Sequence, residues 1–303
     1  MKKSIKFVTI IAVVAVILLL TLTGCSNTPY DKYLNIKWDK ENKEVATYNY
    51  IYEQTGKDTL NGTLTTTIYE AKGQTFKIGT KDFSDIKEGT YYEYNLVVNN
   101  GDSIFGQIYF KGYNNQFFRP VESYTKRIIG ASTTEIQSSY SKNKCTTVYT
   151  NNGVVENLTT EFNKKGIIFD NIQLHAIART LNFSQNGQLA FETPIFEKDS
   201  LYAKKVAMGP AQRLNYNIHN KDTDELIDKT YEFINEGKQF GAVAVILTIN
   251  EKPAGIPQRI VVADKAYSIN GTTFDQPVIR IEEGTKEKGL STYVLSNMVK
   301  VAL

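Results

Sequence analysis

Hydrophobic and polar residues alternate with a period of two along most of this chain. Tyr48, Tyr50 and Tyr52 alternate with Thr47, Asn49 and Ile51. β-branched and aromatic residues in such alternation are typical of strands on a half-buried sheet. The pattern therefore predicts strands over this stretch and over 63–69, 75–78, 92–98, 104–110, 134–140, 146–149 and 154–162.

Turn-forming residues separate these runs. Asn61-Gly62, Lys72-Gly73, the stretch 99–102 and Asn151-Asn152-Gly153 all offer residues that tolerate positive φ. Short strands joined by such turns indicate an antiparallel meander.

One segment has a helical period instead. In 169–182, Leu174, Ile177, Ala178 and Leu181 fall at i, i+3, i+4 and i+7. Asp170 with Gln173 three residues later forms a capping-box pattern, and Phe169 and Leu174 occupy the two positions of a hydrophobic staple. The segment is predicted to be one amphipathic helix packed by a single stripe.

Strand patterns resume after the helix. The run 242–249 is apolar on both faces and predicts a central buried strand. The segment 226–234 fits a helix or a strand, and the alternation of Tyr231 with Phe233 favours a strand. We expect 293–303 to be a frayed end. Further strands are predicted over 201–207, 214–219, 259–263 and 278–281, the last two flanking a turn at Asn270-Gly271.

The chain begins with a pattern that is typical of a secretion signal. Lys2, Lys3 and Lys6 precede an uncharged apolar run over 7–20. As a helix this run would span about 21 Å, short of a hydrocarbon core of about 30 Å. It therefore fits a signal peptide better than a transmembrane helix.

The apolar run ends on Leu22-Thr23-Gly24-Cys25, which resembles the lipobox of bacterial lipoproteins with a type II signal peptide. The resemblance implies cleavage before Cys25 and lipidation of its thiol. It predicts a signal peptide over 1–24, a lipidated tether over 25–33 and a single β-rich domain over 34–303. The protein would be extracytoplasmic and anchored to the outer face of the cell membrane. The alternative is an ordinary signal peptide or an uncleaved anchor with a chance cysteine.

Removal of the signal peptide and lipidation of Cys25 change the net charge of the chain and the number of its free thiols. The chain has 35 Lys and Arg against 32 Asp and Glu, and three of the lysines lie within 1–24. A formally neutral mature domain has no electrostatic footprint for nucleic acid. Cys145, the second of two cysteines, has no disulfide partner once Cys25 is lipidated, and in a strand-like run it is expected to be a small buried hydrophobe.

Candidate chemistry is sparse. The sequence has two histidines, and no nucleophile elbow, zinc-binding His-Glu-x-x-His, phosphate loop or dinucleotide fingerprint. No cofactor and no metal site is predicted. The stretch 220–225 resembles a calcium loop but lacks the glycine and the terminal glutamate that such a loop needs. His219 is expected to be exposed at a turn.

His175 and Arg179 are four residues apart, so they share one flank of the predicted helix. Together they are a candidate polar contact for an anionic headgroup or carboxylate, or simply a flank that meets the sheet or solvent. The tyrosines are open to two interpretations as well. They could line a ligand groove, or, as we prefer, they are good strand residues for a sheet with one wet face.

The order of many antiparallel strands, one helix near 170–179 and further strands is similar to the LolA-like half-barrel envelope proteins. That resemblance implies a mainly β fold, a curved antiparallel sheet with one covering helix, and a concavity for acyl chains. The leading hypothesis is a noncatalytic binding module for an apolar or amphipathic envelope ligand. The alternatives are a structural lipoprotein of an envelope complex and a hydrolase whose carboxylates are assembled by the fold.

Overall fold

The computed structural model describes residues 38–113, 116–164, 166–181, 189–197, 200–216, 240–248, 257–285 and 287–303. The predicted signal peptide, lipobox and tether, His219, the calcium-like stretch 220–225 and the segment 226–234 lie outside these ranges. Within them, no helix has the length and hydrophobicity needed to cross a bilayer.

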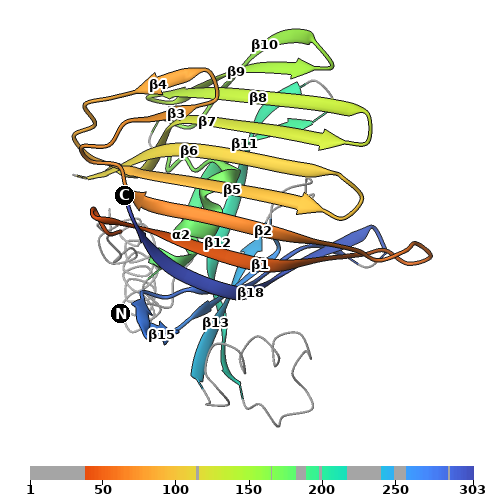
Figure 1. Ribbon diagram of the computed structural model, residues 1–303. Helices are drawn as coiled ribbons and strands as arrows, with labels where there is room; N and C mark the ends of the chain where they lie inside the picture. The colour runs from red at the N-terminus through yellow and green to blue at the C-terminus, as the bar shows by residue number, and fades with distance from the viewer. Residues whose placement is uncertain are drawn as a thin grey trace, which may run out of the picture.

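The described strands form one large, strongly curved antiparallel sheet (Figure 1). Its fourteen strands run in the order β10-β9-β8-β7-β6-β5-β2-β1-β18-β17-β14-β13-β12-β11. The fold is thus mainly β, as predicted. The strands are β1 (Asn42–Glu53), β2 (Leu60–Glu70), β5 (Thr90–Val98), β6 (Ser103–Tyr113), β7 (Gln116–Ile129), β8 (Ser132–Ser141), β9 (Lys144–Asn151), β10 (Val154–Glu161), β11 (Leu189–Glu197), β12 (Ser200–Tyr216), β13 (Phe240–Thr248), β14 (Arg259–Ala263), β17 (Val278–Thr285) and β18 (Gly289–Ala302).

Two meanders meet at the first and last strands. β1 pairs with β18 along its full length, from Asn42 opposite Ala302 to Glu53 opposite Leu290. The expectation of a frayed end over 293–303 is therefore wrong. Its pattern was hidden by a bulge: Thr47 pairs with Asn297 and Tyr48 with Leu295, so Ser296 is an extra residue that breaks the period of two.

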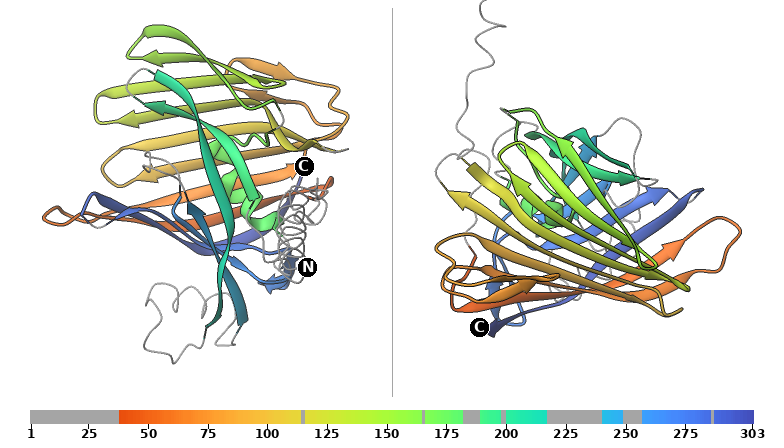
Figure 2. Two further views of the ribbon diagram at one scale, coloured as in Figure 1. Left: turned by 180° about the vertical axis from the view of Figure 1, so that it is seen from behind. Right: turned by 90° about the horizontal axis from the view of Figure 1, so that it is seen from above.

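The two outer edges of the sheet approach each other and nearly close a barrel (Figure 2). The segment after β10 bridges the gap. Ile168 pairs in parallel with Glu192 of β11, and the Glu192 carboxylate accepts a hydrogen bond from the Asn163 amide at 2.6 Å. A parallel bridge here joins the ends of two otherwise antiparallel meanders.

The predicted helix lies on the concave side of the sheet (Figure 2). It consists of a 3-10 turn, η2 (Asn171–Gln173), followed by α2 (Leu174–Thr180). The capping box is present: Asp170 accepts from the Ile172 amide at 2.9 Å, and Gln173 accepts from the Asp170 amide at 3.0 Å. The helix ends at Thr180 because Leu181 is already extended, with ψ at 134°.

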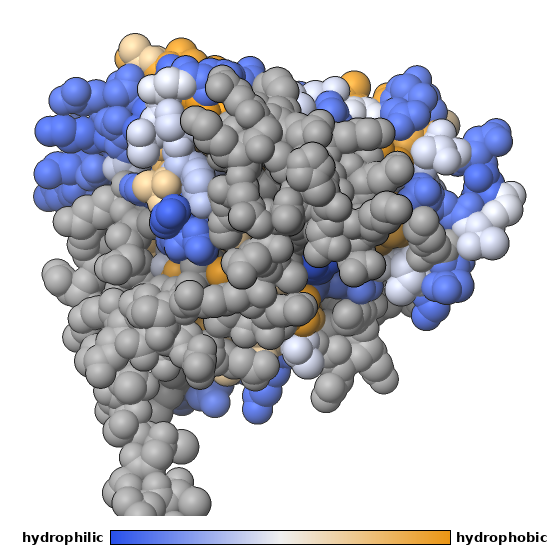
Figure 3. All heavy atoms as spheres, turned by 90° about the horizontal axis from the view of Figure 1, so that it is seen from below, coloured by the Kyte–Doolittle hydropathy of each residue, from blue (hydrophilic) through white to orange (hydrophobic). Residues whose placement is uncertain are grey.

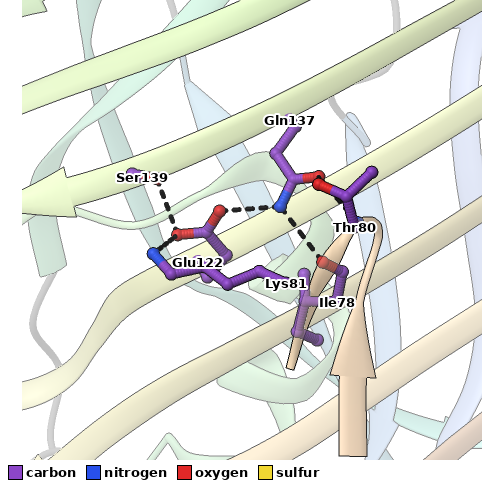
Figure 4. Close-up of polar contacts among 6 residues, drawn as sticks. All are labelled: Ile78, Thr80, Lys81, Glu122, Gln137 and Ser139. Carbon is purple, nitrogen blue, oxygen red and sulfur yellow. Dashed lines mark hydrogen bonds and ion pairs between the residues drawn. The ribbon is translucent and has the colours of Figure 1, made fainter. Parts of the chain in front are cut away.

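A small hairpin covers part of the convex face. β3 (Phe76–Ile78) and β4 (Lys81–Phe83) pack the two Phe rings on Tyr91 and Tyr109. A polar cluster secures the hairpin tip (Figure 4). Buried Glu122 accepts hydrogen bonds from Lys81, Gln137 and Ser139 at 2.9, 2.7 and 2.7 Å, and Gln137 also donates to the Ile78 carbonyl.

The other small hairpin is formed by β15 (Tyr267–Ile269) and β16 (Thr272–Phe274). It turns at Asn270-Gly271, as predicted, and both turn residues have positive φ. The described surface seen from below is mainly hydrophilic, with small hydrophobic groups between (Figure 3). The largest cluster of buried apolar residues includes residues of both the sheet and the helix.

Candidate functional site

A cavity lies between the concave face of the sheet and the helix. The first of its two chambers measures about 60 Å³, large enough for several water molecules. Its apolar wall comes from β2, β5, β6 and η2, and its polar wall from β5, β7, β17, β18 and the helix. The lining residues are Leu64, Leu96, Ile104, Ile172, Tyr94, Arg127, Asn171, His175, Glu283 and Tyr293.

The second chamber measures about 80 Å³ and is richer in hydroxyl groups. Ser123 and Thr125 of β7 and Ser138 of β8 line it together with Asp170. Arg127, Asn171 and Ile172 line both chambers, so the two chambers are neighbours that share these three residues. The cavity is thus apolar at one end and hydroxyl-rich at the other. The remaining residues of the second chamber are Ile136, Pro194, Ile195, Phe196 and Leu201.

Arg127 is the positively charged residue among those that line the cavity. It follows Ser123 and Thr125 at every second residue of β7, which places all three on the concave face. Its Nε is buried, and none of the described residues accepts a hydrogen bond from it. A buried guanidinium N–H without an acceptor is costly, so a ligand or water oxygen would find a ready donor here.

Glu283 of β17 lines the same chamber. Burial raises the pKa of its carboxyl to about 7, although Arg127 and a hydrogen bond from Tyr293 act in the opposite direction. Roughly half of the molecules therefore carry a proton on Glu283 at neutral pH. Since the unfolded group has a pKa of 4.5, folding takes up a proton between about pH 4.5 and 7, and this group's contribution to stability falls as pH rises through that window.

Tyr94 is held in the cavity by a close approach to the neighbouring strand. A Cβ on Gly106 of β6 would lie only 2.4 Å from the Tyr94 ring, so only glycine lets the ring lie against β6. Tyr48, Tyr50 and Tyr92 are also buried. All four tyrosines lie on strands of the curved sheet, as expected of good strand residues, and Tyr94 also lines the cavity.

Of the two predicted contact residues, His175 reaches the cavity. It lines the first chamber, and its Nδ1 lies 3.3 Å from the Tyr92 hydroxyl. Burial lowers the pKa of the imidazole to about 4, so His175 is neutral at pH 7. It can offer a hydrogen bond to a ligand but no charge.

Arg179 lies elsewhere. Its side chain is buried, its Nη2 lies 2.8 Å from Glu44 Oε2 of β1, and it donates to the Asp275 carbonyl at 2.7 Å. It is not among the residues that line either chamber. Arg179 is therefore a residue of a helix flank that meets the sheet, which was the alternative to a ligand contact, because the concave sheet wraps around more than one helical stripe.

Asp170 and Cys145 belong to a buried polar cluster beside the second chamber. Asp170 accepts from Ser123 at 2.6 Å and from the Tyr140 hydroxyl, in addition to its capping bond. Burial raises the pKa of Asp170. Cys145 is fully buried, as predicted, and burial raises the pKa of its thiol to about 11, which keeps it protonated and unreactive.

Metal-binding clusters of three or more His, Cys, Asp or Glu residues are not found in the described ranges. The chemistry that the cavity offers is hydrogen bonding, one guanidinium charge and the carboxyls of Glu283 and Asp170. Neither Arg127 nor Glu283 was a candidate in the sequence.

No family model matches this chain, and a search of curated proteins finds no match. Among solved structures, it is similar to a crystal structure of a beta-barrel-like protein of the domain of unknown function DUF1849 from Brucella abortus. The alignment covers 87% of this chain and 99% of that chain, with 9% sequence identity and a TM-score of 0.43.

Proposed function

We propose that this protein is a membrane-anchored extracytoplasmic lipoprotein that binds a small amphipathic envelope ligand without catalysing a reaction. The observation that carries the binding role is the cavity behind the helix. One chamber is apolar, the other is hydroxyl-rich, and an arginine whose Nε has no acceptor among the described residues lines both. Such a lining suits a molecule with an apolar and a polar end.

The other two hypotheses gain less support. An exposed aromatic patch would favour an interaction lipoprotein, yet the exposed large apolar side chains of the described residues are all aliphatic. A hydrolase needs a second carboxyl that is free to act beside Glu283. The carboxyl oxygens of Asp170 already accept three hydrogen bonds, which gives this residue a structural role.

Ligand binding can be tested with a matched pair of substitutions on β5. Leu96 lines the cavity, whereas its neighbour Val97 is 51% exposed on the opposite face. Leu96→Phe should fill the first chamber and abolish an envelope-derived mass adduct in native mass spectrometry, while Val97→Phe should retain it. Both variants should first be shown to melt cooperatively. A wild-type protein without any adduct after exposure to envelope extract would contradict the binding role.

The anchor can be tested separately. Cys25→Ser removes the thiol that would carry the diacylglycerol, so the precursor should remain uncleaved or be shed instead of being retained as a lipoprotein. Incorporation of labelled palmitate, followed by membrane fractionation, measures this directly. Unchanged label and unchanged retention in the variant would exclude Cys25 as the lipidated residue.

A further inference from the structure

The position of Arg127 gives information about the ligand's chemistry. Its side chain borders both chambers, and its Nε is buried without an acceptor among the described residues. Arginine presents several N–H groups in a planar fork that matches carboxylates, phosphates and sulfates. A group bound here would have the apolar wall on one side and the hydroxyl-rich wall on the other.

The surrounding carboxyls do not neutralise Arg127 by direct contact. Asp170 is occupied by Ser123, Tyr140 and the Ile172 amide. The charge of Arg127 lowers the pKa of Glu283, but no ion pair joins the two side chains within the described residues. The other titratable groups that face Glu283 are Tyr50, Tyr94 and Tyr293, and neutral His175 lines the same chamber.

We propose that the ligand carries an oxyanion that Arg127 binds between the two chambers, and that Glu283 takes up one proton from solvent when this anion binds. The ligand's apolar part then lies among Leu64, Leu96 and Ile104, and its polar part among the hydroxyls of the second chamber. This inference rests on the proposed binding function and defines the ligand as an anionic amphiphile.

The proton uptake follows from electrostatics. An ionised Glu283 would repel an anion held in the same enclosed space, where charges interact more strongly than in water. A protonated Glu283 removes this repulsion and can donate a hydrogen bond to the anion. Since its pKa is already about 7, protonation costs little near neutral pH.

Binding of short-chain probes to the full-length protein in phosphatidylcholine nanodiscs tests the inference. Equilibrium dialysis would compare hexyl sulfate with uncharged hexyl glucoside, with empty nanodiscs as the blank. Arg127→Gln should weaken hexyl sulfate binding about ten- to hundredfold, the effect of losing hydrogen bonds to a charged group. The same variant should bind hexyl glucoside within about threefold of the wild type. Arg127→Lys, which keeps the charge, should lie between wild type and Arg127→Gln.

The pH dependence provides an independent measurement. Hexyl sulfate keeps its charge between pH 6 and 8, so a changing affinity reports on the protein. Between pH 7 and 8 the wild-type affinity should fall by roughly fivefold, because a carboxyl with a pKa of about 7 is already half ionised at pH 7, and the fall approaches tenfold per pH unit only at higher pH. Glu283→Gln should bind hexyl sulfate with a flat pH profile, because its amide cannot ionise.

The outcomes separate this inference from the proposed function. If hexyl glucoside binds but hexyl sulfate does not, or if hexyl sulfate binds equally well to wild type and Arg127→Gln, the anionic class is wrong while the binding role stands. A wild-type profile that is flat between pH 6 and 8 would overturn the role of Glu283. If neither probe binds to the wild type, the proposed binding function itself fails.

Discussion

Replacement of Arg179 by alanine is expected to lower the free energy of unfolding by about 3–5 kcal/mol, the typical effect of breaking a buried ion pair by removing one partner. Arg179 and Glu44 are both largely buried, with 7% and 8% of their side-chain surfaces exposed. Without the guanidinium, Glu44 would remain as an uncompensated buried charge, and the Asp275 carbonyl would lose its donor. Urea unfolding of the variant and the wild type measures this loss.

An exposed ion pair supplies the control. Lys126 and Glu135 are 3.0 Å apart, but 39% and 37% of their side-chain surfaces remain exposed. Lys126→Ala should therefore change the unfolding free energy by less than about 1 kcal/mol. The double variant Arg179→Met/Glu44→Met should recover part of the loss, because it leaves no unpaired charge. A change below about 1 kcal/mol for Arg179→Ala would show that the Glu44 ion pair does not stabilise the helix against β1.

The apolar side of the helix gives the second large expected effect. Leu174 is completely buried and Leu181 is 4% exposed. Leu174→Ala and Leu181→Ala should each lower the unfolding free energy by about 2–5 kcal/mol, through lost transfer free energy and the cavity left behind. The urea midpoint should shift while the slope of the transition stays unchanged.

Val301 offers a matched aliphatic control at 43% exposure on β18, where Val301→Ala should change stability by less than about 0.5–1 kcal/mol. Leu174 does not line the cavity, so the folded Leu174→Ala variant should bind the two hexyl probes with the wild-type affinity. Any apparent loss of binding should match the fraction of the variant that is unfolded. A Leu174→Ala variant as stable as the wild type would contradict the packing of this helix against the sheet.

Local patterns in the sequence predicted the elements whose packing is simple. Between Asn42 and Glu161, the alternation identified every long strand except β7, and the turns predicted at Lys72-Gly73, 99–102 and 151–153 fall where the chain reverses. The turn predicted at Asn61-Gly62 is wrong, because both residues lie within β2 and pair with Ile51 and Tyr50 of β1. The capping box at Asp170 and Gln173 was predictable because its two hydrogen bonds depend on residues only three apart.

β7 was missed because its inward-facing residues are polar. Ser123, Thr125 and Arg127 face the cavity, while Tyr124 and Lys126 face the convex side. The usual signal of apolar residues inside and polar residues outside is therefore absent from this strand. β7 lies between two strands that the alternation did predict, and polar residues occupy every second position in it. This pattern is a sequence signal that could have indicated a polar cavity.

The two charged residues that line the first chamber, Arg127 and Glu283, could not be predicted for a different reason. Arg127 and Glu283 are separated by more than half of the chain, and they meet only because β18 returns beside β1 and brings β17 with it. Arg179 shows the same limit. Its position four residues after His175 suggested a shared flank, but the partner that buries it, Glu44, lies on the first strand of the sheet.

The pairing of β1 with β18 also sets the order in which the molecule can be assembled. The backbone amide of Leu303 donates to the Glu41 carbonyl at 3.1 Å, so the seam is complete only when the last residue is in place. The loop that this contact closes is nearly the whole domain, and contacts of such long range form slowly. A chain leaving a ribosome or a translocation pore would hold two meanders without their β1–β18 seam until the fourteen residues of β18 emerged. Loss of that last strand would leave the edges of β1 and β17 unpaired, and such exposed edges promote aggregation.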